Sequence, residues 1–139
     1  MEGIGRRSVF ALGLAAAAAP VLVSSRAAKA EMYGPDEGKE LAPGVRLVEL
    51  SEREAVIPRY KTVKMVDVVF QPGSHAPQET MENDMVCHML EGGLRIVQNG
   101  QEFSVKKNDV YTCATGTTEE DWNEGDVVAV MRVTNLLPA

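Results

Sequence analysis

The sequence predicts a single all-β domain that follows a short N-terminal export segment. From Val45 onward, every apolar run is short, rich in Val and bounded by Gly, Pro, Asn or Asp, which is typical of short β-strands joined by turns. No segment between residues 45 and 139 sustains a helical period. Residues 31–139 contain no internal repeat or low-complexity block, so one domain accounts for them.

The first thirty residues have the pattern of an export signal. Arg6-Arg7 precedes an Ala-rich apolar run, and Ala28-Lys29-Ala30 supplies the small residues that signal peptidase accepts. Paired arginines there look like a twin-arginine signal peptide, and a general secretory signal is the alternative. A membrane anchor is disfavoured because the run is shorter than the roughly 20 apolar residues of a span and contains Pro20. We expect cleavage after Ala30 and a periplasmic location in a bacterium.

The chain that remains after cleavage is acidic. The full sequence has 14 Lys and Arg and 20 Asp and Glu residues, and the first thirty residues hold four of the former and one of the latter. Residues 31–139 therefore carry a formal charge of −9 with neutral histidine. Such a surface repels nucleic acid and anionic membranes. We expect no nucleic-acid partner and no membrane association after cleavage.

The predicted elements begin after a polar segment. Residues 31–44 have no sustained period, and Gly34-Pro35 and Pro43-Gly44 mark turns, so we expect a flexible N-terminal arm. The predicted strands are Val45–Leu50, Lys61–Phe70, Met85–Leu90, Leu94–Gln98, Gln101–Val105, Asp109–Cys113 and Asp126–Thr134.

Local signals refine this assignment. Ser51–Ala55 could form a single helical turn, and Ile57-Pro58 is best interpreted as the end of an edge segment. Asn99-Gly100 predicts a tight hairpin because both residues tolerate the positive φ angles of a type I′ turn. The last strand alternates to give one apolar face, formed by Val127, Ala129, Met131 and Val133.

Two stretches carry the spacing of a known pair of motifs. Gly73–Gly92 has the length of a Gly, five residues, His-x-His, three residues, Glu, six residues and a closing Gly. Asn108–Asn123 keeps the register of a Gly, five residues, Pro-x-Gly, two residues, His, three residues and Asn, with Gly116 and Asn123 in place. Asn108 replaces the first Gly of this second motif and can still adopt the left-handed conformation of its turn.

In this spacing the chain resembles the cupin family over about residues 45–135. The resemblance implies a single cupin barrel, a double-stranded β-helix or jelly roll, which we assign to residues 45–139. It places Glu79, Met81, Met85 and Glu119 at the four positions where cupins usually carry three His and one Glu as metal ligands. None of the three histidine positions holds His, so we expect no tightly bound catalytic iron and predict no cofactor.

The resemblance also implies a cavity whose lining follows from strand alternation. Counting in steps of two places Cys87 and Met89 on the inward side with Met85, and His88 on the outward side. Cys113 is expected to face the same interior. The predicted ligand pocket is therefore formed by Glu79, Met81, Met85, Cys87, Cys113 and Glu119.

The surroundings of this pocket leave several alternatives open. Cys87 and Cys113 are either a disulfide between neighbouring strands, two buried thiols or a reactive pair. The rim residues are expected to form mainly a solvated face, and we expect Glu79 and Glu119, held close together, to raise the pKa of one of them. These rim residues are His75, Glu82, Asp84, Glu120, Asp121 and Trp122.

Three functions fit the sequence. The first is an exported barrel that binds a small organic molecule without metal. The second is a metalloenzyme of dioxygenase or isomerase type with altered ligands, in which Glu79 and Glu119 hold a divalent ion together with His75 or a neighbouring acid, Glu82 or Asp84. The third is a copper(I) site of Met and Cys side chains, since thioether and thiolate ligands select that ion. A homodimer is expected from the resemblance to small cupins, through Val45–Leu50 with Pro58 nearby.

Export through the twin-arginine route can be tested on the chain itself. Replacing Arg6 and Arg7 by Lys should leave uncleaved precursor in the cytoplasm, because the route depends on the paired arginines. Cell fractionation with N-terminal sequencing measures this, and the exported form should begin at Glu31. Undisturbed export of the double Lys variant would contradict the assignment.

Overall fold

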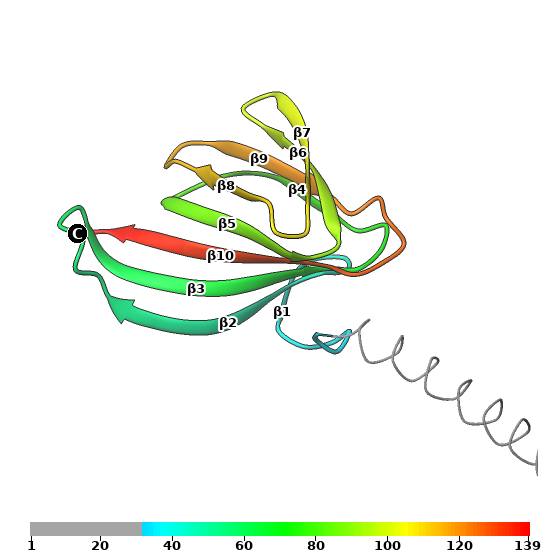
Figure 1. Cartoon of the computed structure of the whole chain (residues 1–139), viewed down its shortest axis with the longest axis horizontal. Coiled ribbons are helices and arrows are strands. Elements are labelled where there is room, and N and C mark those ends of the chain that lie inside the picture. Colours follow the sequence, from blue (N-terminus) through cyan, green and yellow to red (C-terminus); the bar gives the residue numbers. More distant parts are fainter. Residues whose placement is uncertain (1–31) are drawn as a thin grey trace, which may run out of the picture. The chain divides into compact units, whose positions relative to one another are not determined.

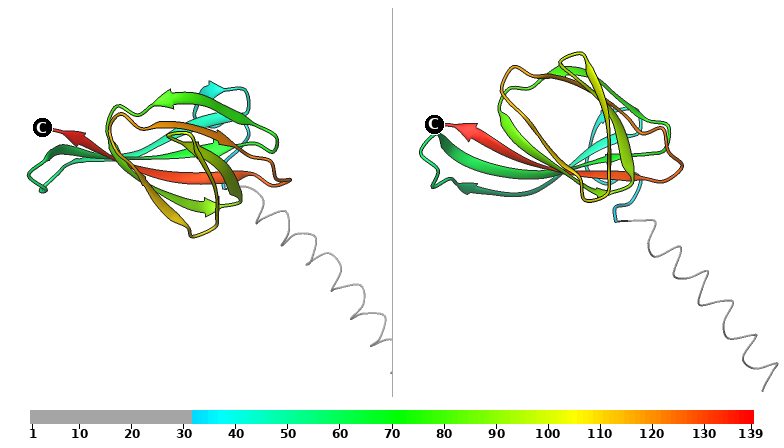
Figure 2. Two further views of the ribbon diagram at one scale, coloured as in Figure 1. Left: turned by 90° about the horizontal axis from the view of Figure 1, so that it is seen from above. Right: turned by 45° about the horizontal axis from the view of Figure 1, so that its top comes forward.

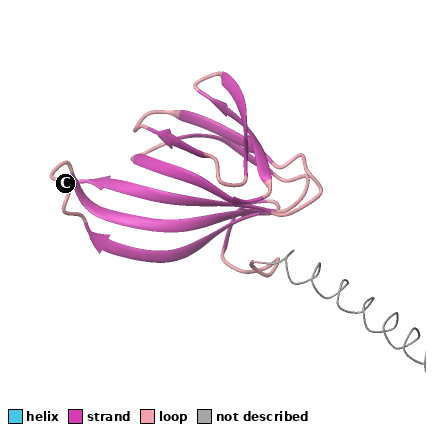
Figure 3. Ribbon diagram, viewed as in Figure 1, coloured by secondary structure: helices cyan, strands magenta, loops and turns pink. Residues whose placement is uncertain are grey.

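The structure is a computed structural model that describes residues 32–139. The predicted export signal and its cleavage point after Ala30 lie outside the described residues. The unit from Tyr33 to Ala139 consists of two antiparallel β-sheets that face each other (Figure 1). Strands and the loops between them make up the described chain (Figure 3), which confirms the all-β prediction.

The larger sheet, sheet A, has the strand order β1-β2-β3-β10-β5-β8. Its strands are β1 (Lys39–Ala42), β2 (Val45–Glu54), β3 (Tyr60–Phe70), β5 (Asp84–Glu91), β8 (Val110–Cys113) and β10 (Ala129–Pro138). Sheet B has the order β4-β9-β6-β7. Its strands are β4 (His75–Thr80), β6 (Gly93–Gln98), β7 (Gln101–Lys106) and β9 (Thr118–Trp122). Because neighbours in each sheet are mostly distant in sequence, the chain crosses repeatedly between the sheets, as in a jelly roll.

The core lies between the sheets and follows the two-residue period of the strands. Phe70, Met89 and Ile96 are its largest fully buried apolar side chains. Burial of one such side chain contributes roughly 1.5–3 kcal/mol to folding, so these positions dominate the stability of the barrel. Cys87 and Met89 are buried while His88 between them is partly exposed, which confirms the inward and outward alternation predicted for β5.

The predicted turns are formed at the expected residues. Asn99 (φ 50°) and Gly100 (φ 79°) connect β6 to β7, and Gln98 pairs with Gln101 across the hairpin. Asn108 has a φ of 73°, so Asn does replace the motif Gly in a left-handed turn. The closing Gly of the first motif, Gly92, has a φ of 68°. A Cβ atom there would lie 2.8 Å from the Cα of Ala129, so a side chain has no room.

Three local expectations were wrong. Ser51–Ala55 forms no helical turn, because β2 continues to Glu54 and pairs with β3 through Glu54 and Thr62. The last strand begins at Ala129, two residues after Val127, which is 58% exposed. Part of the arm expected to be flexible is ordered, since β1 pairs with β2.

The arm is also held by a buried charge on the outer face of sheet A. Asp67 is 0% exposed and accepts two hydrogen bonds of 2.9 Å from the guanidinium of Arg132, on the neighbouring strand. The hydroxyl of Tyr33 donates to the same carboxylate at 2.5 Å. These contacts satisfy Asp67. Burial of the Tyr33 hydroxyl, followed by its hydrogen bond to Asp67 and the charge of that carboxylate, raises the pKa of Tyr33 to about 12. The sequence did not predict that the arm is ordered, because this order depends on the contact between Tyr33 and Asp67, which are 34 residues apart.

One end of sheet A extends beyond sheet B. Figures 1 and 2 show the turn between β2 and β3 and the C-terminal end of β10 projecting past the upper sheet. Val56 and Ile57, in this turn, are 99% and 51% exposed. The projecting end therefore contributes little to the core and leaves apolar side chains at the surface.

The Asp67 ion pair should carry a large share of the stability. Replacing Arg132 by Met leaves Asp67 buried without its cation, and we expect a loss of about 3–5 kcal/mol in the free energy of unfolding, measured with urea. Lys64→Met is the matched control, because Lys64 pairs with the exposed Glu49 and should contribute about 0–1 kcal/mol. Equal losses for the two variants would contradict this account.

Candidate functional site

A group of polar and sulfur side chains lies inside the barrel. β9 is flanked by β4 and β6, and its alternation turns Glu119 and Asp121 inward and Glu120 and Trp122 outward. Glu119 is 6% exposed and Asp121 is 7% exposed. The other inward side chains around them are Met85, Cys87, Tyr111, Cys113 and Met131. We call these seven residues the interior site.

Glu119 is held by donors from β8. The hydroxyl of Tyr111 donates to Oε2 of Glu119 at 3.1 Å, and the thiol of Cys113 donates to Oε1 at 3.1 Å. The Tyr111 hydroxyl also lies 3.0 Å from the sulfur of Met131. It has one proton, and a carboxylate is a stronger acceptor than a thioether sulfur, so we assign the hydrogen bond to Glu119. Burial, with Cys87 and Glu119 nearby, raises the pKa of Tyr111, so the phenol keeps the proton that it donates. Both oxygens of Glu119 are therefore satisfied.

Asp121 is the residue of the interior site whose carboxyl group is not fully hydrogen-bonded. Its Oδ1 atom is buried and has no hydrogen-bond partner, which is costly for a polar atom inside a protein. Burial, followed by the charge of Glu119, raises the pKa of Asp121 to about 9. The carboxyl group of Asp121 is therefore protonated at neutral pH.

The two cysteines are free thiols in the wall of the site. Cys87 faces Tyr111 and Cys113 faces Met85 across β5 and β8, so the cysteines lie diagonally from each other. Contact with Cys87, then burial, raises the pKa of Cys113. A thiol with a raised pKa is a poor nucleophile. Of the alternatives left open by the sequence, the structure has the two buried thiols.

Gln98 closes the site between the two sheets. Its side chain, at the end of β6 in sheet B, donates to the carbonyl of Thr112 at 3.0 Å, and Thr112 belongs to β8 of sheet A. It also lies 3.1 Å from the sulfur of Cys113. Gln98 was not among the predicted site residues. It directly precedes the Asn99-Gly100 turn and lies on the same inward face of β6 as Leu94 and Ile96.

Comparison with known proteins identifies the architecture. No protein-family model matches the chain, and no curated protein matches its sequence. Among solved structures, the Cupin_2 domain of an XRE family transcriptional regulator from Enterobacter cloacae superposes with a TM-score of 0.58 at 11% identity, over 69% of this chain and 99% of that one. The chain has a cupin fold. This confirms the fold that the motif spacing predicted.

Two further cupin structures are similar. A Cupin 2 conserved barrel domain protein from Salinispora arenicola gives a TM-score of 0.57 at 16% identity, over 76% of this chain and 87% of that one. KdgF from Halomonas sp. gives 0.56 at 15% identity, over 70% of this chain and 84% of that one. At such identities the likeness establishes the fold, and the function has to be argued from the site.

The residues at the cupin metal positions do not fit a divalent first-row metal. Glu79 pairs with Glu119 in register but is exposed at the end of β4. Met81 is half-buried against the core, and Met85 is buried opposite Cys113. Thioethers are soft donors, and both oxygens of Glu119 already accept hydrogen bonds. Within residues 32–139, no group of three or more His, Cys, Asp or Glu side chains is close enough to hold a metal ion.

The alternative ligand set of Glu79, Glu119 and His75 does not come together. His75 lies on the outer face of sheet B, where its Nε2 atom is 2.5 Å from Glu120 and its ring stacks on Trp122 at 4.8 Å. It pairs with the outward Trp122, whereas Glu119 points inward. His75 therefore does not reach Glu119, because its partner Trp122 is three residues from Glu119 on β9 and faces the opposite side of the sheet.

The acidic partner of Glu119 also differs from the prediction. The motif spacing predicts Glu79 as this partner and Asp121 as a residue of the solvated rim, whereas Asp121 is the buried neighbour with the raised pKa. The signal was present, because Asp121 follows Glu119 by two residues and so shares its face in a strand. The bulge in β4, between Ala76 and Glu79, has no signal in the sequence. It leaves Glu79 exposed near the end of the strand.

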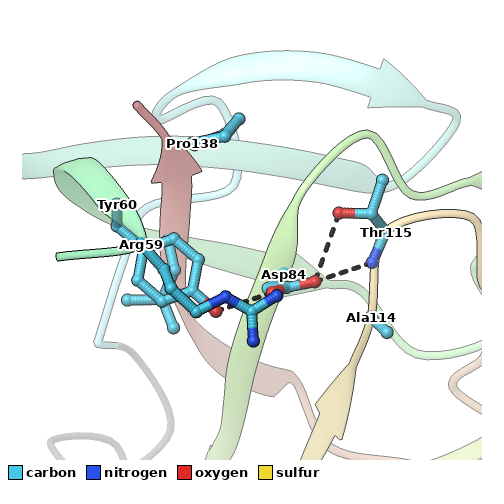
Figure 4. A pocket seen from close by; sticks show the side chains of 7 residues that line it. Arg59, Tyr60, Asp84, Ala114, Thr115 and Pro138 are labelled. Carbon is cyan, nitrogen blue, oxygen red and sulfur yellow. Dashed lines mark hydrogen bonds between the residues drawn. The ribbon is translucent and has the colours of Figure 1, made fainter. Parts of the chain in front are cut away.

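A hollow lies at the projecting end of sheet A (Figure 4). It has a volume of about 230 Å³ and is lined by Arg59, Tyr60, Asp84, Ala114, Thr115, Leu136 and Pro138. Asp84 accepts hydrogen bonds from the Tyr60 hydroxyl at 2.6 Å and from the backbone and hydroxyl of Thr115, and these donors lower its pKa. Because Asp84 is fully engaged in joining β3, β5 and the turn before β9, it serves the structure rather than a ligand.

The asparagine of the second motif is structural as well. Asn123 is 1% exposed, and its amide donates to the carbonyls of Phe70 and Val127 while its oxygen accepts from the backbone of Gly125. It thereby fixes the loop between β9 and β10. Among the residues that the structure describes, no helix is long and apolar enough to cross a membrane.

The unpartnered carboxyl of Asp121 should lower stability in a pH-dependent way. Its folded pKa, about 9, lies above the ordinary 3.8, so the unfolded chain releases the proton first and stability falls as pH rises between these values. Asp121→Asn removes this penalty without changing shape. We expect the variant to gain about 1–3 kcal/mol at neutral pH, with the gain growing toward pH 9. Urea unfolding at several pH values measures it.

Glu120→Gln is the control for this measurement, since Glu120 lies on the same strand but faces outward. Its difference from the parent chain should not grow toward pH 9. A gain for Asp121→Asn that is the same at every pH would contradict the assignment of the proton to Asp121.

Proposed function

We propose that this chain is an exported cupin-domain protein that binds a small organic molecule in the interior site without a metal ion. The observation that carries the proposal is the buried Oδ1 atom of Asp121, which has no partner inside the chain. Natural proteins pair nearly all buried polar atoms, so an unpaired one is suited to a ligand. The methionine, thiol and aliphatic side chains around the interior site match the mostly apolar lining of small-molecule sites.

Adaptable side chains support the same proposal. Met85, Met89 and Met131 are buried in the interior, and methionine fills irregular space around different shapes. A copper(I) site is the second candidate, favoured by the contact between the Cys87 and Cys113 thiols with Met85 opposite Cys113. It requires both thiols to lose their protons, and the raised pKa of Cys113 disfavours that step.

The proposal extends to location and assembly. Export to the periplasm rests on the sequence of residues 1–30. A homodimer is supported by the exposed apolar side chains of Leu50, Val56 and Ile57, on β2 and the turn after it. Within the predicted interface segment Val45–Leu50, Leu50 is exposed, whereas Val45 is buried in the core. Light scattering at micromolar concentration should give the mass of two chains, and a monomer mass would contradict the assembly.

Purification from the protein's own compartment tests the function. We expect native mass spectrometry to show an organic molecule that leaves on denaturation, and elemental analysis to show no stoichiometric metal. Asp121→Leu should lose the molecule, because its recognition atom is gone, whereas Glu120→Leu on the opposite face should keep it. Stoichiometric iron, manganese or zinc would instead establish the metalloenzyme, and stoichiometric copper the sulfur site. A chain that carries neither metal nor organic molecule and binds none from a compound library would contradict all three.

A further inference from the structure

A turn with exposed apolar side chains lies at the projecting end of sheet A. It joins β2 to β3, and its side chains Val56 and Ile57, which we call the apolar tip, are 99% and 51% exposed. The amide of Ala55 donates to the carbonyl of Lys61 at 2.9 Å. The amide of Tyr60 donates to the carbonyl of Ile57 at 3.0 Å. Because these bonds fix the turn, the apolar tip can bind a partner at a low cost in conformational entropy.

The hollow shown in Figure 4 lies beside the apolar tip. Arg59 and Tyr60, which follow the tip in the chain, are part of its lining. Arg59 is exposed, so its guanidinium can stay in water. The hydroxyls of Tyr60 and Thr115 both donate to Asp84 and are already satisfied. The rest of the lining consists of Ala114, Leu136 and Pro138. An apolar side chain can therefore fill the hollow without leaving a polar group unsatisfied.

The projecting end also carries charges of both signs that have no partner within the described chain. Residues 50–62 contain three basic and two acidic side chains, which are Arg53, Arg59, Lys61, Glu52 and Glu54. The ion pairs among residues 32–139 involve none of them. Four of the five line a wider hollow of about 580 Å³ at the same end.

This charge balance matters for contact between two copies of the chain. Residues 31–139 carry a formal charge of −9, so two copies that meet through acidic faces repel each other. Residues 50–62 carry a formal charge of +1, which Asp84 in the hollow offsets. The projecting end is therefore a face on which a second copy meets both signs of charge without net repulsion.

An apolar tip and a hollow side by side on one end suit a two-fold pair. In such a pair the tip of each chain enters the hollow of the other, so one face serves both chains and the assembly closes. A standard interface buries about 800 Å² on each partner, which is more than two side chains provide. The ends of β2, β3 and β10 around the tip must therefore take part in the contact.

We propose that the projecting end binds a second copy of this chain, with Val56 and Ile57 of each copy in the hollow of the other. The unpaired acidic and basic side chains of residues 50–62 then lie opposite groups of the other sign. This inference rests on the homodimer proposed above and names the face through which the dimer forms.

Val56→Asp tests the apolar tip. The dissociation constant of the dimer, measured by sedimentation, should rise at least about a hundredfold, because two carboxylates per dimer would lie against apolar walls. Val110→Asp is the matched control and should leave the dimer intact. Val110 is 64% exposed, but it begins β8 and does not line the hollow.

Ala114→Phe tests the hollow. Ala114 is exposed, so the chain can fold with the larger side chain, which then occupies the space that the tip of the other copy needs. We expect a comparable loss of dimer. Thr112→Phe is the control, because Thr112 is also exposed, lies two residues earlier and does not line the hollow. Circular dichroism shows that each variant is folded.

Cross-linking tests the exchange between chains directly. Chains with Val56→Cys are mixed with chains that carry Ala114→Cys and a tag of different mass, and a short bismaleimide is added. We expect unlike chains to be joined in preference to like chains. Cys87 and Cys113 are buried, and the parent chain with the same reagent controls for them.

The outcomes separate this contact face from the homodimer on which it rests. A dimer that survives Val56→Asp or Ala114→Phe, equal weakening by either control, or cross-links without a preference for unlike chains would each overturn the contact face while the homodimer stands. A monomer mass for the parent chain at micromolar concentration would contradict both. Ligand binding by the interior site is measured on the purified protein and does not depend on either result.

Discussion

The two-residue period of β9, fixed between β4 and β6, is the constraint on which the candidate site depends. Pairing on both sides leaves this strand no freedom to rotate, so Glu119 and Asp121 must face inward while Glu120 and Trp122 face outward. A slip of one residue would bury Trp122 and Glu120 and expose the acid pair. Contacts on both faces then support the same register, because Glu119 bonds to β8 and Trp122 stacks with His75 and Arg95.

Asp67 and Asp121 are both buried carboxyl groups, but their surroundings differ. Asp67 has an internal cation and a tyrosine donor, and together they bind the N-terminal arm to sheet A. Asp121 has neither, and burial and the charge of Glu119 keep it protonated. An unsatisfied polar atom in an otherwise well-paired fold is a cost that folding alone does not explain. We infer that the difference between the two sites reflects recognition.

The motif residues that this chain retains are those that shape the backbone. Gly92 has no room for a side chain, Asn108 makes a left-handed turn, and Asn123 ties the loop after β9 to β3. These three residues hold turns and a loop, whereas the interior of the barrel is lined by carboxyl and sulfur groups. The backbone geometry of the barrel therefore does not depend on the side chains of its interior site.

The sequence by itself determined the all-β class, the Asn99-Gly100 hairpin and the inward side of β5, since these depend on local turn chemistry and on a period of two. It also predicted strands at β2, β3, β5, β6, β7, β8 and β10, but not at β1, β4 or β9. Glu119 and Cys113 were also found, by motif position and alternation. Only the tertiary structure decided that Oδ1 of Asp121 has no partner, that Glu79 stays exposed and that His75 lies on the other face. The reason is that bulges, pairing between distant strands and the distribution of buried charge depend on contacts across the barrel, which a single strand does not encode.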